Sequence, residues 1–217
     1  VGGHCVGASR QVQETRLAHS LFDISTLEPL IQRGCVFLTP NSRLSRRISD
    51  EWNALRMAAG ERVWEPLEVY PVERWLQRQW ERAQHLDLVR PVLPLSRQQE
   101  LQVWQQVIAD HGRSAGGAAL LRPAGAAELA SDARDLLVRW RVNPRAARER
   151  QLFMLERDCA TFLDWLELFD QRLDAAGQCT QADTLVALAG VARELGTPRA
   201  ALIACEDLAP LVRDCLD

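Results

Sequence analysis

The segment FLTPNSRLSRR, residues 37–47, gathers five side chains whose types and spacing suit the binding of phosphate groups. They occupy the end of a predicted strand, the turn after it and the first turns of a predicted helix: Thr39, Asn41, Arg43, Arg46 and Arg47. Ligands of a parallel sheet bind outside the carboxyl ends of its strands, and a helix N-terminus offers unpaired N–H groups to an anion. The segment therefore predicts contacts with a nucleic-acid backbone. The alternative is a surface helix whose arginines are only solvated.

Two carboxylates, Glu206 and Asp207, follow the apolar run at 201–205 and are the other candidates for chemistry. Acids at the end of a strand in an α/β domain often hold magnesium beside a nucleotide. The same pair also suits a charged turn that caps the next helix. The residues alone leave both interpretations open.

The N-terminal segment GGHCVGAS, residues 2–9, fits the phosphate-loop pattern G-x-x-x-x-G-K-[ST] except at the lysine, where Ala8 stands. The chain contains no lysine, because all 26 of its basic residues are arginine. A phosphate loop needs an ammonium group to reach the β- and γ-phosphates of the nucleotide. We therefore expect no nucleotide cofactor, and residues 1–20 are predicted to be a disordered leader, with a remnant phosphate loop as the alternative.

Charge, hydropathy and the spacing of cysteine and histidine exclude several further classes. The six cysteines and four histidines are scattered, so we expect free thiols in a reducing cytoplasm and no metal site. A net charge of −3 argues against a protein coated for tight non-specific binding of nucleic acid, so a DNA contact must come from a local arginine cluster. No apolar run approaches the roughly 18 residues that span a bilayer, and no membrane contact is expected.

A sheet is needed to position these candidates, and three short apolar runs predict its strands. The runs are residues 35–40, 66–71 and 201–205. Because helical patterns separate the runs, the strands are expected to be parallel. Pro40 and Asn41 end the first strand, and a helix is expected over 42–59 with apolar residues recurring at three and four positions.

The stretch between the second and third strands is helical almost throughout and predicts a large all-helical insertion. One helix is expected over 126–141, with an inward stripe of Leu129, Leu136, Leu137 and Trp140. The longest is expected over 150–175, with an inward stripe of Leu152, Leu155, Cys159, Phe162, Leu166, Phe169 and Leu173. Most of the seven tryptophans fall on such stripes, which favours core packing over base stacking.

The order of these segments resembles the first motor domain of UvrD-like superfamily 1 helicases. VFLTPNSRLSRRI resembles their motif Ia, where a threonine at the strand end and its neighbours contact single-stranded DNA. LEVYPVERWLQRQW resembles the next strand and helix, and the helices from PLSRQQELQVWQQVIAD onward resemble the helical 1B insertion. ALIACEDLAPL stands where motif II is expected, although Glu206 and Asp207 match it loosely, because a working motif II has more acids and a following glutamine.

The closer similarity is to AddB-like DNA repair proteins of bacteria, in which the superfamily 1 helicase is inactivated and a PD-(D/E)xK nuclease domain lies at the C-terminus. The similarity rests on the pattern TPN-x-RL-x-R and extends over residues 21–217. It implies an α/β fold with a helicase-like parallel sheet over 21–95, a helical insertion over 96–198 and a return to the sheet over 199–217. It also implies DNA contacts at Thr39, Asn41 and Arg43.

The resemblance and the missing lysine together predict a non-catalytic domain that binds or guides DNA, and single-stranded DNA is the expected form. The expected partners are the remaining domains of the same protein or an AddA-like helicase subunit. One alternative is a protein–protein interaction module without DNA contact. Another is a residual nucleotide-binding enzyme, which binding of ATP and magnesium would reveal.

Overall fold

The computed structural model describes residues 24–114, 123–196 and 198–216, and the chain divides into two compact units. Of the described residues, 24–71 and 198–204 form one unit, and 72–114, 123–196 and 205–216 form the other. The leader and the phosphate-loop-like segment predicted near the N-terminus lie outside the described residues. The described chain is largely helical with a small parallel sheet.

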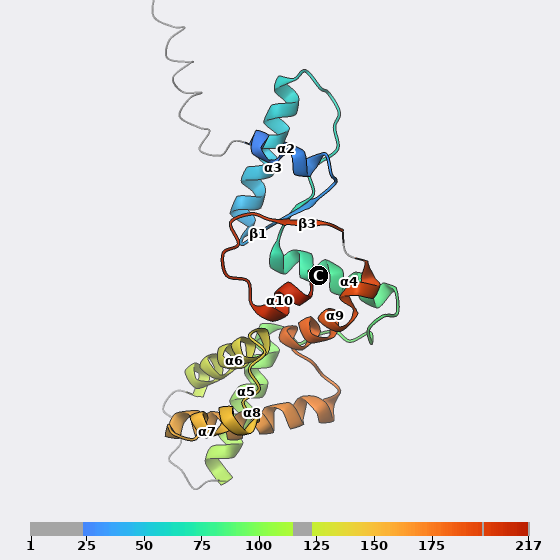
Figure 1. The fold of residues 1–217 in the computed structure, drawn as a ribbon. Helices are drawn as coiled ribbons and strands as arrows, with labels where there is room; N and C mark the ends of the chain where they lie inside the picture. The colour runs from blue at the N-terminus through green and yellow to red at the C-terminus, as the bar shows by residue number, and fades with distance from the viewer. Residues whose placement is uncertain (1–23, 115–122, 197, 217) are drawn as a thin grey trace, which may run out of the picture. The chain divides into compact units, whose positions relative to one another are not determined.

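The first unit contains a three-stranded parallel sheet with the order β2-β1-β3 (Figure 1). The strands are β1 (Val36–Thr39), β2 (Val69–Pro71) and β3 (Ala200–Leu202). Phe37 of β1 pairs with Val69 on one side and with Ala201 on the other. This confirms the predicted parallel sheet and places the strand that ends in Thr39 at its centre.

Helix α3 (Ser42–Ala58) follows β1 and forms the core of this unit with η1 (Ile24–Leu27) and α2 (Glu28–Ile31). Its buried residues Ile48 and Trp52 pack in one cluster with Phe37. The Asn41 side chain accepts a hydrogen bond of 3.0 Å from the Leu44 amide, which caps the helix as predicted. The turn and the helix start are therefore fixed by local chemistry.

The described part of the second unit is built from helices (Figure 1). They are α4 (Val72–His85), α5 (Arg97–Ser114), α6 (Pro123–Arg139), α7 (Ala147–Phe153), α8 (Arg157–Ala176), α9 (Gln181–Leu195) and α10 (Pro210–Asp214). One core cluster joins α5, α6 and α8, and the Trp104 and Phe169 rings stack there with centroids 3.9 Å apart. This unit includes α4 and α10, because both pack against α9.

The apolar stripe predicted on α6 is largely wrong. Leu129 is 73% exposed, Leu136 is 57% exposed and Trp140, just after the helix, is 50% exposed. The buried face carries small and polar side chains instead, and α6 packs extensively against α5. Its buried members are Ala127, Ala130, Ser131 and Arg134. Small side chains let two helices approach closely, which explains why this face is the inner one.

The long helix predicted over 150–175 is two helices, α7 and α8, separated by a turn at 154–156. The break leaves Leu152 and Leu155 exposed, so the first two positions of the predicted stripe are wrong. The remainder of the stripe is buried or half-buried, and Gly177 ends α8 in the left-handed conformation. Helix α9 matches its predicted bounds and starts with a capping box between Thr180 and Asp183.

Most tryptophans lie in the interior, as predicted. Trp52, Trp75, Trp80 and Trp104 are buried, whereas Trp140, which follows the end of α6, is exposed. Within the described ranges, no helix combines the length and the apolar character that crossing a lipid bilayer demands.

Candidate nucleic-acid interface

The Thr39 side chain ends β1 in the interior of the sheet-bearing unit, with 0% of its surface exposed. Its Oγ1 donates a hydrogen bond of 2.9 Å to the Asn41 carbonyl oxygen and lies 2.6 Å from the Ser45 Oγ. Each hydroxyl has one proton, so both contacts are satisfied when Ser45 donates to Thr39. Thr39 therefore shapes the turn, and a nucleic-acid contact at this segment falls on its exposed neighbours rather than on the Thr39 side chain.

The turn leaves backbone donors available at the start of α3. Asn41 caps Leu44 through its side chain, and the Asn41 carbonyl accepts the Ser45 amide at 3.3 Å. Among the described residues, the amides of Ser42 and Arg43 have no hydrogen-bond acceptor. Free N–H groups and the positive end of a 17-residue helix favour an anion at this position.

Three exposed arginines surround this helix start, but they differ in their partners. Arg47 forms an ion pair of 2.6 Å with Glu51 one turn further along α3. Arg43 and Arg46 make no ion pair with any residue that the structure describes. Arg43 and Arg46 are three positions apart and so are neighbours on the helix surface. These two guanidinium groups are the ones available to a phosphate backbone.

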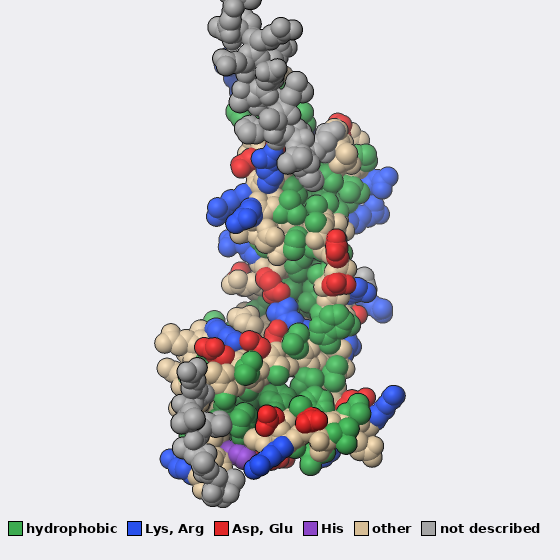
Figure 2. Space-filling view, turned by 90° about the vertical axis from the view of Figure 1, so that its left-hand side faces the viewer, with side chains coloured by type: hydrophobic (Ala, Val, Ile, Leu, Met, Phe, Trp, Pro, Cys, Tyr) green, Lys and Arg blue, Asp and Glu red, His purple; other side chains and the backbone are tan. Residues whose placement is uncertain are grey.

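The positive charge is local rather than general. The described part of the sheet-bearing unit contains seven arginines and six carboxylates. On the face drawn in Figure 2, acidic and basic side chains are interspersed and form no continuous basic surface. A phosphate chain would therefore be held by the Arg43–Arg46 pair and the helix start, and not by a broad electrostatic field.

No protein-family model matches this chain, and no curated protein or solved structure is significantly similar to it. The site must therefore be judged on its own geometry.

Sequence reasoning missed Ser45, which locks Thr39 in place. Its position carries a signal, because Ser45 precedes Ile48 by three residues and Trp52 by seven, and so lies on the buried face of α3. A small hydroxyl residue on an apolar face suggests a hydrogen-bond partner across the core.

Glu206 and Asp207 lie exposed in the chain between β3 and α10. Strand β3 ends at Leu202, so the two acids do not directly follow it, and Ala204 turns the chain with a φ of 54°. Within the described residues, no group of three acidic, histidine or cysteine side chains is arranged to hold a metal ion. We assign no function to Glu206 and Asp207.

Proposed function

We propose that this chain binds single-stranded DNA at the start of α3 and is a non-catalytic, helicase-like domain of an AddB-like DNA repair protein. The observation that carries the proposal is the pair Arg43 and Arg46, exposed and without an acidic partner among the described residues, beside two free backbone amides. The pair lies just past the carboxyl end of the central strand, where parallel sheets bind their ligands.

The resemblance to motif Ia supports DNA as the ligand, since that segment contacts single-stranded DNA in active superfamily 1 helicases. In this chain the contacts fall on Arg43 and Arg46, with Asn41 holding the helix start and Arg47 contributing less because Glu51 already neutralises it. Such contacts position the backbone and carry no base specificity.

The non-catalytic part of the proposal rests on the absence of lysine from the whole chain. Without an ammonium group at a phosphate loop, the terminal phosphates of a nucleotide lack their principal cation. Isothermal titration with ATP and magnesium tests this part separately, and we expect no binding heat. ATP turnover by the purified chain would contradict it.

Binding of a labelled oligothymidylate, followed by fluorescence anisotropy, tests the DNA part. We expect saturable binding at low salt that weakens when Arg43 and Arg46 are both replaced by alanine. An anisotropy that does not change on addition of the chain would contradict the proposal.

The second candidate is a scaffold for a protein partner, such as the remaining domains of the same protein or an AddA-like helicase subunit. The exposed Leu129, Leu136 and Trp140 of the α6 region favour it, because large apolar side chains gathered on one helix face often mark an interaction site. Loss of association with the partner after Leu136→Gln, with DNA binding intact, would support this candidate.

A further inference from the structure

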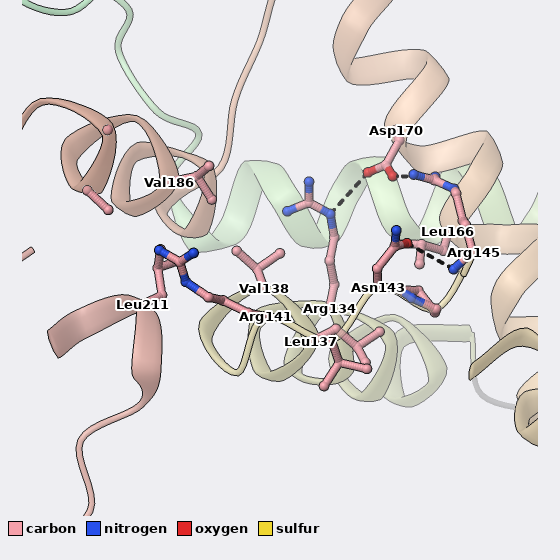
Figure 3. Close-up of a pocket in the computed structure, with 14 residues that line it drawn as sticks. Arg134, Leu137, Val138, Arg141, Asn143, Arg145, Leu166, Asp170, Val186 and Leu211 are labelled. Atoms are coloured by element: carbon pink, nitrogen blue, oxygen red, sulfur yellow. Dashed lines mark hydrogen bonds and ion pairs between the residues drawn. The ribbon is translucent and has the colours of Figure 1, made fainter. Parts of the chain in front are cut away.

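A pocket of about 760 Å³ lies within the helical unit, between the end of α6 and helices α8, α9 and α10 (Figure 3). Its walls are aliphatic, with Leu137, Val138, Leu166, Val186 and Leu211 facing the space. The volume falls in the range of about 300–1,000 Å³ that small-molecule sites occupy. This pocket shares no residue with the DNA site proposed at α3.

Three arginines line the pocket, and they differ in how many of their nitrogens are already hydrogen-bonded. Arg134 is buried and uses all its nitrogens within the fold, where they contact Asp170, Thr180 and Asp183. It forms part of the wall and is not available to a ligand.

Arg141 and Arg145 also line the pocket, and each has a side chain about half exposed. The Nη2 of Arg145 bonds to Asp170 at 2.6 Å, and the Nη2 of Arg141 bonds to Asp214. Among the described residues, no other side-chain hydrogen bond engages either guanidinium group. In Figure 3 the guanidinium groups of Arg141 and Arg145 lie on opposite sides of the pocket, so each offers a separate position for an anion.

Arg141 has a backbone conformation that its residue type disfavours. It ends α6 with a φ of 55°, and the Val142 amide donates to the Leu137 carbonyl at 2.8 Å, as in a Schellman cap. Glycine is the usual residue at this position, so a side chain there strains the backbone. The Arg141 side chain is nevertheless present, and it pairs with Asp214.

Gly190 departs from local preference in the opposite direction. It lies inside α9, where glycine is less favourable than alanine. An added Cβ atom would meet no described atom within 4 Å, so the internal packing does not require glycine. Gly190 lines the same pocket as Arg141. Gly190 therefore leaves open space on the α9 side of the pocket.

We propose that this pocket binds a small organic anion with an aliphatic body, such as a medium-chain carboxylate. The aliphatic walls accept the body, Gly190 leaves space for it beside α9, and Arg141, which lines the pocket together with Gly190, receives the anionic group. No residue that lines the pocket is aromatic, which argues against a nucleotide base as the occupant.

Amide NMR titration of the full chain with octanoate tests the proposal, with 1-octanol as the uncharged match. We expect saturable shifts in the loop at 140–146 and around Gly190 with octanoate, and at least about tenfold weaker binding of 1-octanol, which lacks the charge-assisted hydrogen bonds. Equal binding of the two compounds, or no saturable shift with octanoate, would overturn the proposal.

Two variants locate the site without threatening the fold. Gly190→Leu fills the pocket and favours the helix, and Arg141→Gly removes the guanidinium group while relaxing the backbone. Each should weaken octanoate binding about tenfold or more at unchanged or higher melting temperature. Gly125→Leu, an exposed glycine of α6 outside the pocket, is the control and should bind like the parent chain. Parent-like binding by both Gly190→Leu and Arg141→Gly would refute the assignment.

Discussion

The hydroxyl oxygens of Thr39 and Ser45 lie 2.6 Å apart in the interior, where they join the end of β1 to the first turns of α3. Both hydroxyls also lie near the Asn41 carbonyl oxygen, which is 2.9 Å from the Thr39 Oγ1 and 3.3 Å from the Ser45 Oγ. The pair therefore fixes the turn that places Arg43 and Arg46 at the surface.

Replacement of Thr39 by valine keeps the shape of the side chain and removes the hydroxyl. Ser45 then loses its buried partner, and we expect a loss of about 1–3 kcal/mol in unfolding free energy. Ser45→Ala should cost a similar amount. The double variant should cost less than the sum of the two single variants, because the lost contact is shared. Urea denaturation of the four chains measures this coupling, and strictly additive costs would show that the two hydroxyls do not interact.

Arg134 is a buried arginine of the helical unit, with 10% of its side chain exposed. Its guanidinium contacts Asp170 at 3.1 Å, Thr180 at 2.9 Å and Asp183 at 2.9 Å. Burial opposes its charge, but the neighbouring carboxylates of Asp183 and Asp170 outweigh burial and raise the pKa of Arg134 above its ordinary value.

We expect Arg134→Met to destabilise the chain by about 3–5 kcal/mol, because it leaves carboxylates without their buried partner. Arg145→Gln is the matched control, since Arg145 also pairs with Asp170 but is about half exposed, and it should cost at most about 1 kcal/mol. Thermal or urea unfolding distinguishes the two. Equal effects of both substitutions would contradict the structural role assigned to Arg134.

The buried thiol of Cys215 makes the unfolding free energy depend on pH in the alkaline range. Burial raises the pKa of its thiol to about 12, with a smaller contribution from Asp214. In the unfolded chain the thiol ionises near its ordinary pKa of 9.0. The stabilisation is therefore complete below pH 9 and decreases as the pH rises toward 12, by at most about 1.4 kcal/mol per pH unit.

The chain has no lysine and one tyrosine, so the other groups that titrate in this range are chiefly its remaining cysteines, and the effect of Cys215 must be isolated by substitution. Urea denaturation between pH 8 and about 10.5 should show a smaller decline for Cys215→Ala than for the parent chain. Cys159→Ala, which retains Cys215, is the control and should keep the parent slope. An unchanged slope in Cys215→Ala would contradict the inferred burial of this thiol.

The exposed leucines of α6 should tolerate substitution with little change in the unfolding free energy, whereas buried leucines should not. Leu136→Gln should change the unfolding free energy by no more than about 0.5 kcal/mol, because Leu136 is 57% exposed. Leu166→Ala, at a buried position of α8, should cost about 2–5 kcal/mol. A cost of Leu136→Gln comparable with that of Leu166→Ala would show that this face is covered in the free chain.

The sequence predicted the β1–α3 region closely because every local signal agrees there. Pro40 ends the strand, Asn41 caps the helix and Ile48 and Trp52 recur at helical spacing, as the structure bears out. The structure of a segment can be predicted from its sequence when turn chemistry and periodicity agree in this way.

The inner face of α6 could not be predicted in this way. Periodicity selects large apolar side chains, but this helix buries small and polar residues such as Ala127 and Arg134 and exposes Leu129 and Leu136. The charge of Arg134 is acceptable in the interior only because Asp170 and Asp183, from two other helices, meet it there. Partners 36 and 49 positions away leave no local signal in the sequence.

The break between α7 and α8 was missed for a related reason. No glycine or proline lies at 154–156, so nothing in the sequence marks the end of a helix there. The candidate site was also predicted only in part. Its exposed arginines follow from composition and position, whereas the burial of Thr39 depends on Ser45 and on the packing of α3 against the sheet.

The salt dependence of oligothymidylate binding tests the central claim most directly. Each phosphate contact contributes to the slope of affinity against salt concentration, so Arg43→Ala with Arg46→Ala should weaken binding and lower that slope by about one to two. Arg33→Ala with Arg62→Ala removes the same charge from exposed positions of the same unit and should leave the slope nearly unchanged. Equal slopes for the two double variants would contradict a DNA site at the start of α3.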